Sequence, residues 1–420
     1  MPKVFIRTYG CTLNQADSDI LRALLKEKYQ IVDNEEESDV IILNTCTVKG
    51  ATENKIFEYI KTLRKSNKKF VVAGCISANE KKIRRFAPLA PIITPSSLKS
   101  ICDAVNDALL QNPSFYNVFQ SKELLPKTFS SPIMRIPIND GCVSSCHYCQ
   151  TKFARPFLHS YSPKTIVKWI NKSVNNGARE IQLTSMDSGA YGLDLKTNLI
   201  KLLEAIISDT KTDERFLVRL GMINPDHAKR MLPDIISKLK HGRFYKFLHI
   251  PVQTGSEKVC KEMNRDHTIK DFIDIVKVLR LNIPEVSIAT DIIVGYPTET
   301  EEDFQQTLNL LKEIEPDTTN VSKFSPRPGT KAKELTQLHN DEIKRRSKET
   351  SELVRKISEK RRKMYIGKEY EVLITEKSPD FKGRNINYQQ VVVRNFKGKL
   401  GDFVTVKIAD ANHGSLFGIQ

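Results

Sequence analysis

No stretch of this sequence is apolar for long enough to cross a membrane. A membrane-spanning helix needs roughly 18–20 consecutive apolar residues, and no apolar run among the 420 residues approaches that length. The first ten residues, MPKVFIRTYG, also lack the apolar core of a secretion signal. These two absences predict a cytoplasmic protein with no membrane segment.

Acidic residues are too few to balance the basic ones. The chain has 66 Lys and Arg against 50 Asp and Glu, a formal net charge of +16. Such a bias favours a polyanionic partner, nucleic acid first, although a soluble lysine-rich surface would give the same count. The eight cysteines do not indicate disulfides in a reducing compartment, so we interpret them as metal ligands or reactive thiols.

The N-terminal part alternates strands with helices. The apolar runs KVFIRTYG, DVIILNTC, KFVVAGC and PIIT are each followed by a helical pattern. This alternation predicts a parallel sheet covered on both faces, a doubly wound α/β domain over residues 1–112. Residues 113–131, polar and proline-containing, are predicted to be a linker.

Strand and helix patterns resume after the linker and change again near the end. Residues 132–356 contain six strand candidates, RIPIN, EIQLTS, RFLVRLGMI, FYKFLHIPV, VSIATDIIVG and TNVSKFS, which predict a partial (β/α)6 barrel. A charge-rich helix is expected from about Asn340 to Lys363, lying along phosphates or simply solvated. Residues 357–420 contain short strands typical of a small all-β barrel of the OB type, which binds oligonucleotides.

The segment GCVSSCHYC carries the strongest chemical signal. Cys142, Cys146 and Cys149 follow the first barrel strand with Cx3CxxC spacing, which lets three thiolates hold a 4Fe-4S cluster and leaves one iron open. A zinc site with a remote fourth ligand is the alternative, but zinc motifs favour paired CxxC units. His147 lies between two better ligands, and we interpret it as a bystander.

A second group of cysteines is spread along the N-terminal part. Cys11, Cys46 and Cys75 each stand just beyond a predicted parallel strand, and the carboxyl ends of such strands line one crevice. We therefore expect the three thiols to converge and to ligate a second cluster. Cys102 and Cys260 lie on apolar helix faces and are expected to be core residues.

With these motifs the chain resembles the methylthiotransferase branch of the radical S-adenosylmethionine (SAM) enzymes over essentially its full length. The matching segments are YGCTLNQADS, NTCTV, INDGCVSSCHYC, HIPVQTGSEKVCKEMNR, TDIIVGYPTETEEDF and FSPRPGT. The resemblance implies an N-terminal cluster domain, a radical SAM barrel and a C-terminal TRAM domain. It also implies two 4Fe-4S clusters and SAM, used to insert sulfur at an unactivated C–H bond and to methylate it.

The resemblance further implies SAM contacts within the barrel. Tyr148 is expected near the adenine, and further contacts are expected at strand ends. Each of these residues could equally cap a helix or satisfy a backbone group. The expected contacts besides Tyr148 are Asp187, Ser188, Arg219, Gln253, Ser256 and Asp291. The sequence does not identify a catalytic side chain, and the radical is expected to be generated at the cluster held by Cys142, Cys146 and Cys149.

Within that branch, the closest resemblance is to the archaeal and eukaryotic enzymes for N6-threonylcarbamoyladenosine. It is carried by TKFARPFLHSYSP and LTSMDSGAYG and implies 2-methylthiolation of that nucleoside at tRNA position 37. Lys152, with Arg155 behind it, is our candidate partner for the substrate carboxylate, although Lys152 could instead contact phosphate or tune the cluster. The absence of a C-terminal membrane anchor favours the archaeal form.

Other functions stay open at this point. The same chemistry on prenyl-adenosine, or on an aspartate of a ribosomal protein, is the nearest alternative, and a non-catalytic metal-containing RNA-binding protein is another. The basic C-terminal part favours tRNA as the partner. An electron donor of the flavodoxin or ferredoxin type is also expected, and the protein is expected to be a monomer.

Overall fold

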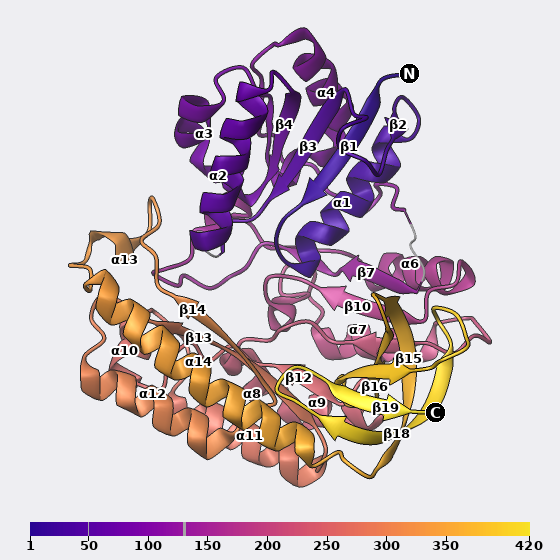
Figure 1. The fold of residues 1–420 in the computed structure, drawn as a ribbon, viewed down its shortest axis with the longest axis vertical. Coiled ribbons are helices and arrows are strands. Elements are labelled where there is room, and N and C mark those ends of the chain that lie inside the picture. Colours follow the sequence, from indigo (N-terminus) through magenta and orange to yellow (C-terminus); the bar gives the residue numbers. More distant parts are fainter. Residues whose placement is uncertain (49, 129–131) are drawn as a thin grey trace.

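Three β structures follow one another along the chain: a parallel sheet, an open barrel and a small closed barrel (Figure 1). The computed structural model describes residues 1–48, 50–128 and 132–420. The last three residues of the predicted linker, 129–131, therefore lie outside the described residues, and the proposed domain limits stay a prediction.

The N-terminal sheet has six parallel strands in the order β2-β1-β3-β4-β5-β6. It is confirmed as a doubly wound sheet because its strands alternate their side chains between two layers of helices. Ile42 and Val71 face α1 (Thr12–Leu25) and α4 (Ile101–Leu110), whereas Ile41 and Val72 face α2 (Gly50–Lys65) and α3 (Glu80–Phe86). The strands are β1 (Lys3–Thr8), β2 (Gln30–Ile31), β3 (Val40–Thr45), β4 (Lys69–Gly74), β5 (Ile92–Ile93) and β6 (Phe115–Tyr116).

Two of these strands differ from the sequence-based expectation. β2 and β6 have two residues each, too few to show the alternation by which a strand is recognised. β6 lies in the segment expected to be a linker and pairs with β5. The following residues also pack inward, since Lys122 and Lys127 are buried.

The six expected barrel strands are all present and form the central open barrel. They make two three-stranded parallel sheets, β11-β10-β7 and β12-β13-β14, joined by a bridge between Val218 and Phe244. The strands are β7 (Ile133–Pro137), β10 (Glu180–Thr184), β11 (Leu217–Arg219), β12 (Phe247–His249), β13 (Ser287–Val294) and β14 (Thr318–Lys323). β8 (Asn139–Asp140) pairs antiparallel with β9 (His159–Ser160), and residues 141–158 form the connection between them.

Helices cover the outside of this barrel and bury its main hydrophobic core. They are α6 (Pro163–Asn175), α7 (Leu199–Ser208), α8 (Pro225–Arg230), α9 (Leu232–Lys240), α10 (Glu257–Glu262), α11 (Ile269–Asn282) and α12 (Glu301–Ile314). Capping boxes begin α11 at Thr268 and α12 at Thr300. In the part of the chain that is described, no helix is long and apolar enough to span a bilayer.

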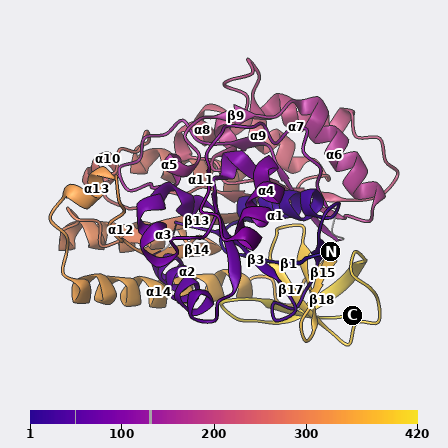
Figure 2. The same ribbon diagram turned by 90° about the horizontal axis from the view of Figure 1, so that it is seen from above.

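The long charged helix is confirmed as α14 (Asn340–Lys363). It packs against β14 and α12 and runs along the outside of the barrel toward the C-terminal strands (Figures 1 and 2). Arg346 and Thr350 are buried on its inner face.

The C-terminal residues form the expected small β-barrel, closed in the order β15-β16-β17-β19-β18. β16 and β19 were not predicted, because the segments FKGRN and LFGI lack a clear alternation of apolar residues. The strands are β15 (Glu369–Lys377), β16 (Phe381–Asn385), β17 (Gln390–Arg394), β18 (Phe403–Ala411) and β19 (Leu416–Ile419).

The small barrel closes one end of the central barrel. The ring of Tyr388 packs against those of Tyr245 and Phe247, with centroids 4.8 Å apart in each case. The Tyr388 hydroxyl lies 3.1 Å from both the Glu180 carboxylate and the Gln182 side-chain nitrogen. Because Glu180 and Phe247 begin β10 and β12, the closed end is the one where the strands start.

Candidate active site

Three thiols meet at the carboxyl edge of the N-terminal sheet. Cys11, Cys46 and Cys75 directly follow or lie just beyond β1, β3 and β4, and the strand order reverses between β1 and β3, where such sheets form a crevice. The Asn14 side-chain oxygen lies 3.8 Å from Cys11 Sγ and 3.7 Å from Cys75 Sγ. A Cβ added at Gly10 would lie 3.0 Å from Cys46 Sγ. The structure therefore brings this triad together.

Two of these thiols are enclosed and protonated at neutral pH. Cys46 and Cys75 are buried, while Cys11 is exposed. Burial raises the pKa of Cys46 to about 12 and also raises the pKa of Cys75. A metal bound here must displace these protons, as is usual when a buried thiol becomes a ligand.

The second triad lies in the loop that follows β8. Gly141 begins this loop with φ 74°, and a Cβ there would clash with the Phe157 carbonyl at 1.9 Å, so only glycine fits. The loop is held from outside, since His147 N donates to Met263 O at 3.0 Å and Asn264 Nδ2 donates to Ser145 O at 3.1 Å. His147 Nδ1 lies 2.8 Å from Glu262 O, which gives the ring a structural partner.

An arginine that sequence reasoning missed contacts the second triad. Arg265 donates to Cys146 Sγ at 3.3 Å, to Asn224 Oδ1 at 2.9 Å and to Pro251 O at 3.1 Å. It follows the end of α10, 119 residues from Cys146. Its segment was noted for the resemblance, but no spacing rule connects two residues so far apart.

Asp187 and Ser188 are both fully buried beside this loop. The Asp187 carboxylate accepts hydrogen bonds from Gly189 N, from the backbone and side-chain nitrogens of Asn224, and from His227 Nδ1. Asn224 Nδ2 also donates to Ser144 Oγ at 3.2 Å. Four protein donors hold the Asp187 carboxylate in place, and its expected contact with SAM stays a prediction.

The four remaining residues expected to contact SAM lie in different surroundings. Ser256 is buried, caps α10 and donates to Asp303 Oδ1 at 2.6 Å, so its hydroxyl already has a structural partner. Arg219 lies on β11 with its guanidinium over the Phe247 ring, 5.3 Å from the centroid. Asp291 on β13 pairs with His249 at 3.1 Å. Gln253 follows β12 with φ 73°.

Strand alternation places several of these side chains inside the barrel. Leu217 and Phe247 belong to the interior cluster beneath Tyr388, and Arg219 and His249 lie two residues further along the same strands, hence on the same face. His249 was not singled out from the sequence. Tyr148 packs against the separate cluster of Tyr296 and Phe324.

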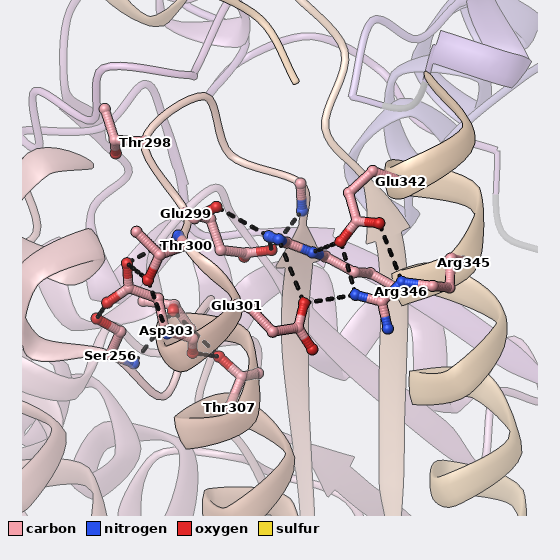
Figure 3. A network of polar contacts seen from close by, with 12 residues as sticks. Ser256, Thr298, Glu299, Thr300, Glu301, Asp303, Thr307, Glu342, Arg345 and Arg346 are labelled. Carbon is pink, nitrogen blue, oxygen red and sulfur yellow. Dashed lines mark hydrogen bonds and ion pairs between the residues drawn. The ribbon is translucent and has the colours of Figure 1, made fainter. Parts of the chain in front are cut away.

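The loop that carries Tyr296 is fixed by a buried ion pair (Figure 3). Glu299 accepts from Gly295 N at 3.0 Å and from Arg346 Nη1 at 2.6 Å. Burial raises the pKa of Glu299, and the hydrogen bond with Arg346 opposes that rise. Through Glu299, Arg346 of α14 therefore helps to fix the turn after β13.

Lys152 and Arg155 have different surroundings. Lys152, Cys146 and Cys149 line a cavity of about 320 Å³ together with Phe153 and Lys331. Arg155 is buried and paired with Asp17 and Asp140. Its guanidinium is held by these two carboxylates, and the expectation that Arg155 supports Lys152 at a substrate carboxylate stays a prediction.

The donor chemistry of both triads fits an iron–sulfur cluster. Each offers three thiols, the ligands that such clusters take, and leaves a fourth position open. Within the described residues, no group of three or more His, Cys, Asp or Glu side chains is arranged to hold a single metal ion. Cys102 on α4 and Cys260 on α10 pack in hydrophobic cores, as expected.

Three family models match successive parts of the chain. They are the uncharacterized protein family UPF0004 at residues 3–93, the radical SAM superfamily at 136–311 and the TRAM domain at 363–419. Solved structures share the fold alone: the radical SAM methyltransferase TsrM from Kitasatospora setae has a TM-score of 0.57 at 12% identity, over 79% of this chain and 75% of its own. The cobalamin-dependent SAM radical enzyme OxsB has a TM-score of 0.52 at 13% identity, over 83% of this chain and 56% of its own.

Curated relatives match from end to end. A protein of Archaeoglobus fulgidus named "Probable threonylcarbamoyladenosine tRNA methylthiotransferase" is 39% identical, over 99% of this chain and 98% of its own length. A Pyrococcus horikoshii protein of the same name is 37% identical, over 100% and 99%. The Drosophila melanogaster "Threonylcarbamoyladenosine tRNA methylthiotransferase" is 35% identical, over 99% of this chain and 77% of its own. The chain therefore belongs to the threonylcarbamoyladenosine tRNA methylthiotransferase family.

Proposed function

We propose that this protein replaces the hydrogen on carbon 2 of N6-threonylcarbamoyladenosine, at tRNA position 37, with a methylthio group. The observation that carries the proposal is the identity of 35–39% with relatives of that name over nearly the whole chain. The two thiol triads support it, because insertion of sulfur at a C–H bond needs one centre that makes a radical and another that presents sulfur.

The chain's own residues prepare the first centre. When bound to the barrel triad, a 4Fe-4S cluster and SAM supply a 5′-deoxyadenosyl radical that takes hydrogen from an unactivated carbon. Cys142, Cys146 and Cys149 would hold that cluster. Arg265 donates to Cys146 Sγ, and this charge-assisted hydrogen bond would orient the sulfur within its loop. Cys11, Cys46 and Cys75 would hold a second cluster on the sulfur-bearing side.

The proposed reaction balances with two SAM molecules and outside donors. The substrate hydrogen leaves in 5′-deoxyadenosine, and the methyl carbon comes from the second SAM. Sulfur must be supplied as sulfide, and one electron by a flavodoxin- or ferredoxin-like protein to cleave the first SAM, which also leaves methionine. Methyl transfer from the second SAM to sulfide leaves S-adenosylhomocysteine. Joining the resulting methylthiolate to the substrate radical releases one electron, which an iron–sulfur cluster would accept. The closed C-terminal barrel is the proposed tRNA-binding part, and we propose a monomer divided at residues 112, 131 and 356.

Mass spectrometry of tRNA nucleosides tests this proposal. The gene would be expressed in a host that lacks its own methylthiotransferase but makes both threonylcarbamoyl- and prenyl-adenosine. We expect 2-methylthio-N6-threonylcarbamoyladenosine to appear while prenyl-adenosine stays unmodified. Methylthiolated prenyl-adenosine as the main product, or a methylthiolated ribosomal-protein aspartate with unchanged tRNA, would overturn it. A Cys149→Ala variant separates catalysis from RNA binding, because it should cleave no SAM.

A further inference from the structure

The residues next to the thiols of one triad touch the residues next to the thiols of the other. Thr47 follows Cys46, and Gln150 follows Cys149. The Thr47 hydroxyl donates to Gln150 Oε1 at 2.5 Å, and both side chains are buried. This hydrogen bond joins two loops that are otherwise 103 residues apart.

A second contact of the same kind lies beside Cys11. Thr12 follows Cys11 and begins α1, and its hydroxyl lies 2.8 Å from that of Thr184, the last residue of β10. β10 pairs directly with β7, the strand that leads to the second triad. The loop of Cys11 is thus tied to the barrel at the level of the strand ends.

The third contact, beside Cys75, is made by Arg155, whose guanidinium interacts with the Cys75 thiol and forms ion pairs with two carboxylates. Arg155 caps α5 (Thr151–Ala154), the short helix that starts two residues after Cys149, and α5 packs against the turn Cys75–Asn79. Arg155 pairs with Asp17 on α1 and with Asp140, two residues before Cys142. Lys122 completes the group, 2.7 Å from Asp17 and 3.1 Å from Asp140. The positive charges of Arg155 and Lys122 therefore balance the negative charges of Asp17 and Asp140 between the two triads.

We propose that these three contacts, one for each cysteine loop of the N-terminal sheet, set the distance between the two thiol triads. This inference rests on the proposed function, which needs both centres to meet at one substrate carbon. Thr47, Gln150, Thr12, Thr184 and Arg155 are thus positioning residues and not ligands. A displacement of about 1 Å in such an arrangement costs about a hundredfold in rate, and a substrate radical that no sulfur reaches is lost to quenching.

The Thr47–Gln150 pair gives the sharpest test, because Thr47→Val and Gln150→Leu each remove the hydrogen bond with little change in volume. The reconstituted full-length variants should keep their iron content and form 5′-deoxyadenosine at the wild-type rate. The ratio of 5′-deoxyadenosine to methylthiolated nucleoside should rise by about ten- to a hundredfold. Pulsed EPR of the reduced protein should show a broader distribution of distances between the two clusters.

Matched controls separate positioning from a general loss of stability. Thr62→Val on α2 and Gln305→Leu on α12 change the same residue types at exposed sites, and should leave both the ratio and the distance distribution unchanged. The Thr47→Val/Gln150→Leu double variant should be no worse than Thr47→Val alone, which also removes the longer contact of 3.5 Å between the Thr47 hydroxyl and Glu53 Oε2.

An unchanged ratio together with an unchanged distance distribution in both single variants would overturn the inference. Loss of half the iron in them would also overturn it, since it would assign the pair to holding a cluster. A wild-type protein that cleaves SAM but never yields a methylthiolated nucleoside would contradict the proposed function instead, and the EPR distances would still decide the inference.

Discussion

Lys152 is the residue that most directly tests the choice of nucleoside. It stands beside Cys149 in the cavity next to the second triad, and a threonylcarbamoyl carboxylate needs a cation there if it is partly buried. We expect Lys152→Ala to lower kcat/KM for threonylcarbamoylated tRNA by about ten- to a hundredfold, the value of a charged hydrogen bond. The measurement is steady-state methylthiolation of purified tRNA.

Binding of tRNA that lacks the threonylcarbamoyl group supplies the comparison for Lys152. Its affinity should be the same for wild type and Lys152→Ala, and Lys164→Ala, at an exposed site on α6, should change neither quantity. If Lys152→Ala lost affinity equally for tRNA with and without the threonylcarbamoyl group, this lysine would instead contact the phosphates of the tRNA.

The buried Lys127 should make the free energy of unfolding of the protein depend on pH. Its ammonium is buried, 3.6 Å from the centroid of the Trp169 ring. Burial, with repulsion from Lys122, lowers the pKa of Lys127 to about 7, against about 10.4 in an unfolded chain. Between these values the unfolded chain binds more protons, so stability rises with pH as the folded state loses its buried charge.

Replacing Lys127 by Met should remove this dependence. Urea unfolding at pH 7, 8 and 9 should show wild type gaining stability relative to Lys127→Met, by at most about 1.4 kcal/mol per pH unit. Lys168→Met, at an exposed position on α6, should follow wild type. Parallel curves for wild type and Lys127→Met would show that the buried lysine keeps its proton.

Local sequence spacing predicted the cysteine ligands but not the residues that contact them. The six proposed ligands were singled out because Cx3CxxC and the ends of predicted strands are local patterns. Arg265 and His249 were not singled out, and the ion pair between Arg155 and Asp17, which lies 138 residues away, was not predicted. Contacts over such separations depend on how the sheet and the barrel pack, which no short motif encodes.

At the scale of elements, α14 shows why a basic helix in a sequence does not by itself indicate RNA binding. Arg345 pairs with Glu301, Glu342 and Glu349, and Lys360 pairs with Glu315. Two of these acids, Glu301 and Glu315, come from α12 and the residue that follows it, and the other two lie on α14 itself. These basic side chains are therefore already paired within the protein. The sequence predicted the bounds of this helix but not its partners.

The two neighbouring arginines of α14 provide a stability test. Arg346 is buried with Glu299, whereas Arg345 is about half exposed beside the same loop (Figure 3). Arg346→Ala leaves a buried carboxylate without its cation and should lower the free energy of unfolding by about 3–5 kcal/mol. Arg345→Ala should cost less than about 1 kcal/mol. Urea denaturation measures both, and equal losses would contradict the assigned burial.

For the whole molecule, iron content tests the arrangement in two centres. Reconstituted without oxygen, the protein should carry about eight irons. Replacing Cys142, Cys146 and Cys149 with Ala should halve this number and abolish SAM cleavage. Replacing Cys11, Cys46 and Cys75 should halve it but leave 5′-deoxyadenosine detectable.

Cys102→Ala is the control for these iron measurements and should retain all of the iron, because Cys102 lies on α4 and packs against the hydrophobic core of the N-terminal sheet. Full iron content in the variant that lacks Cys11, Cys46 and Cys75 would rule out a second cluster.

The fold as a whole was largely predictable because its strands are strongly patterned. All six barrel strands and the order of the three parts follow from apolar periodicity. The short strands β2 and β6 could not be predicted, and neither could the packing of Tyr388 beneath the central barrel, where a residue of the C-terminal part meets Glu180 more than 200 residues earlier.

That packing has a consequence for how the protein is made. Chains leave the ribosome from the N-terminus, so the central barrel is synthesised completely before Ile386, Tyr388 and Phe403 become available to cover Leu217 and Phe247. Until then one end of the barrel exposes apolar and aromatic side chains to water. The nascent chain is thus most prone to aggregation after the central barrel has been made and before β16, β17 and β18 cover its open end.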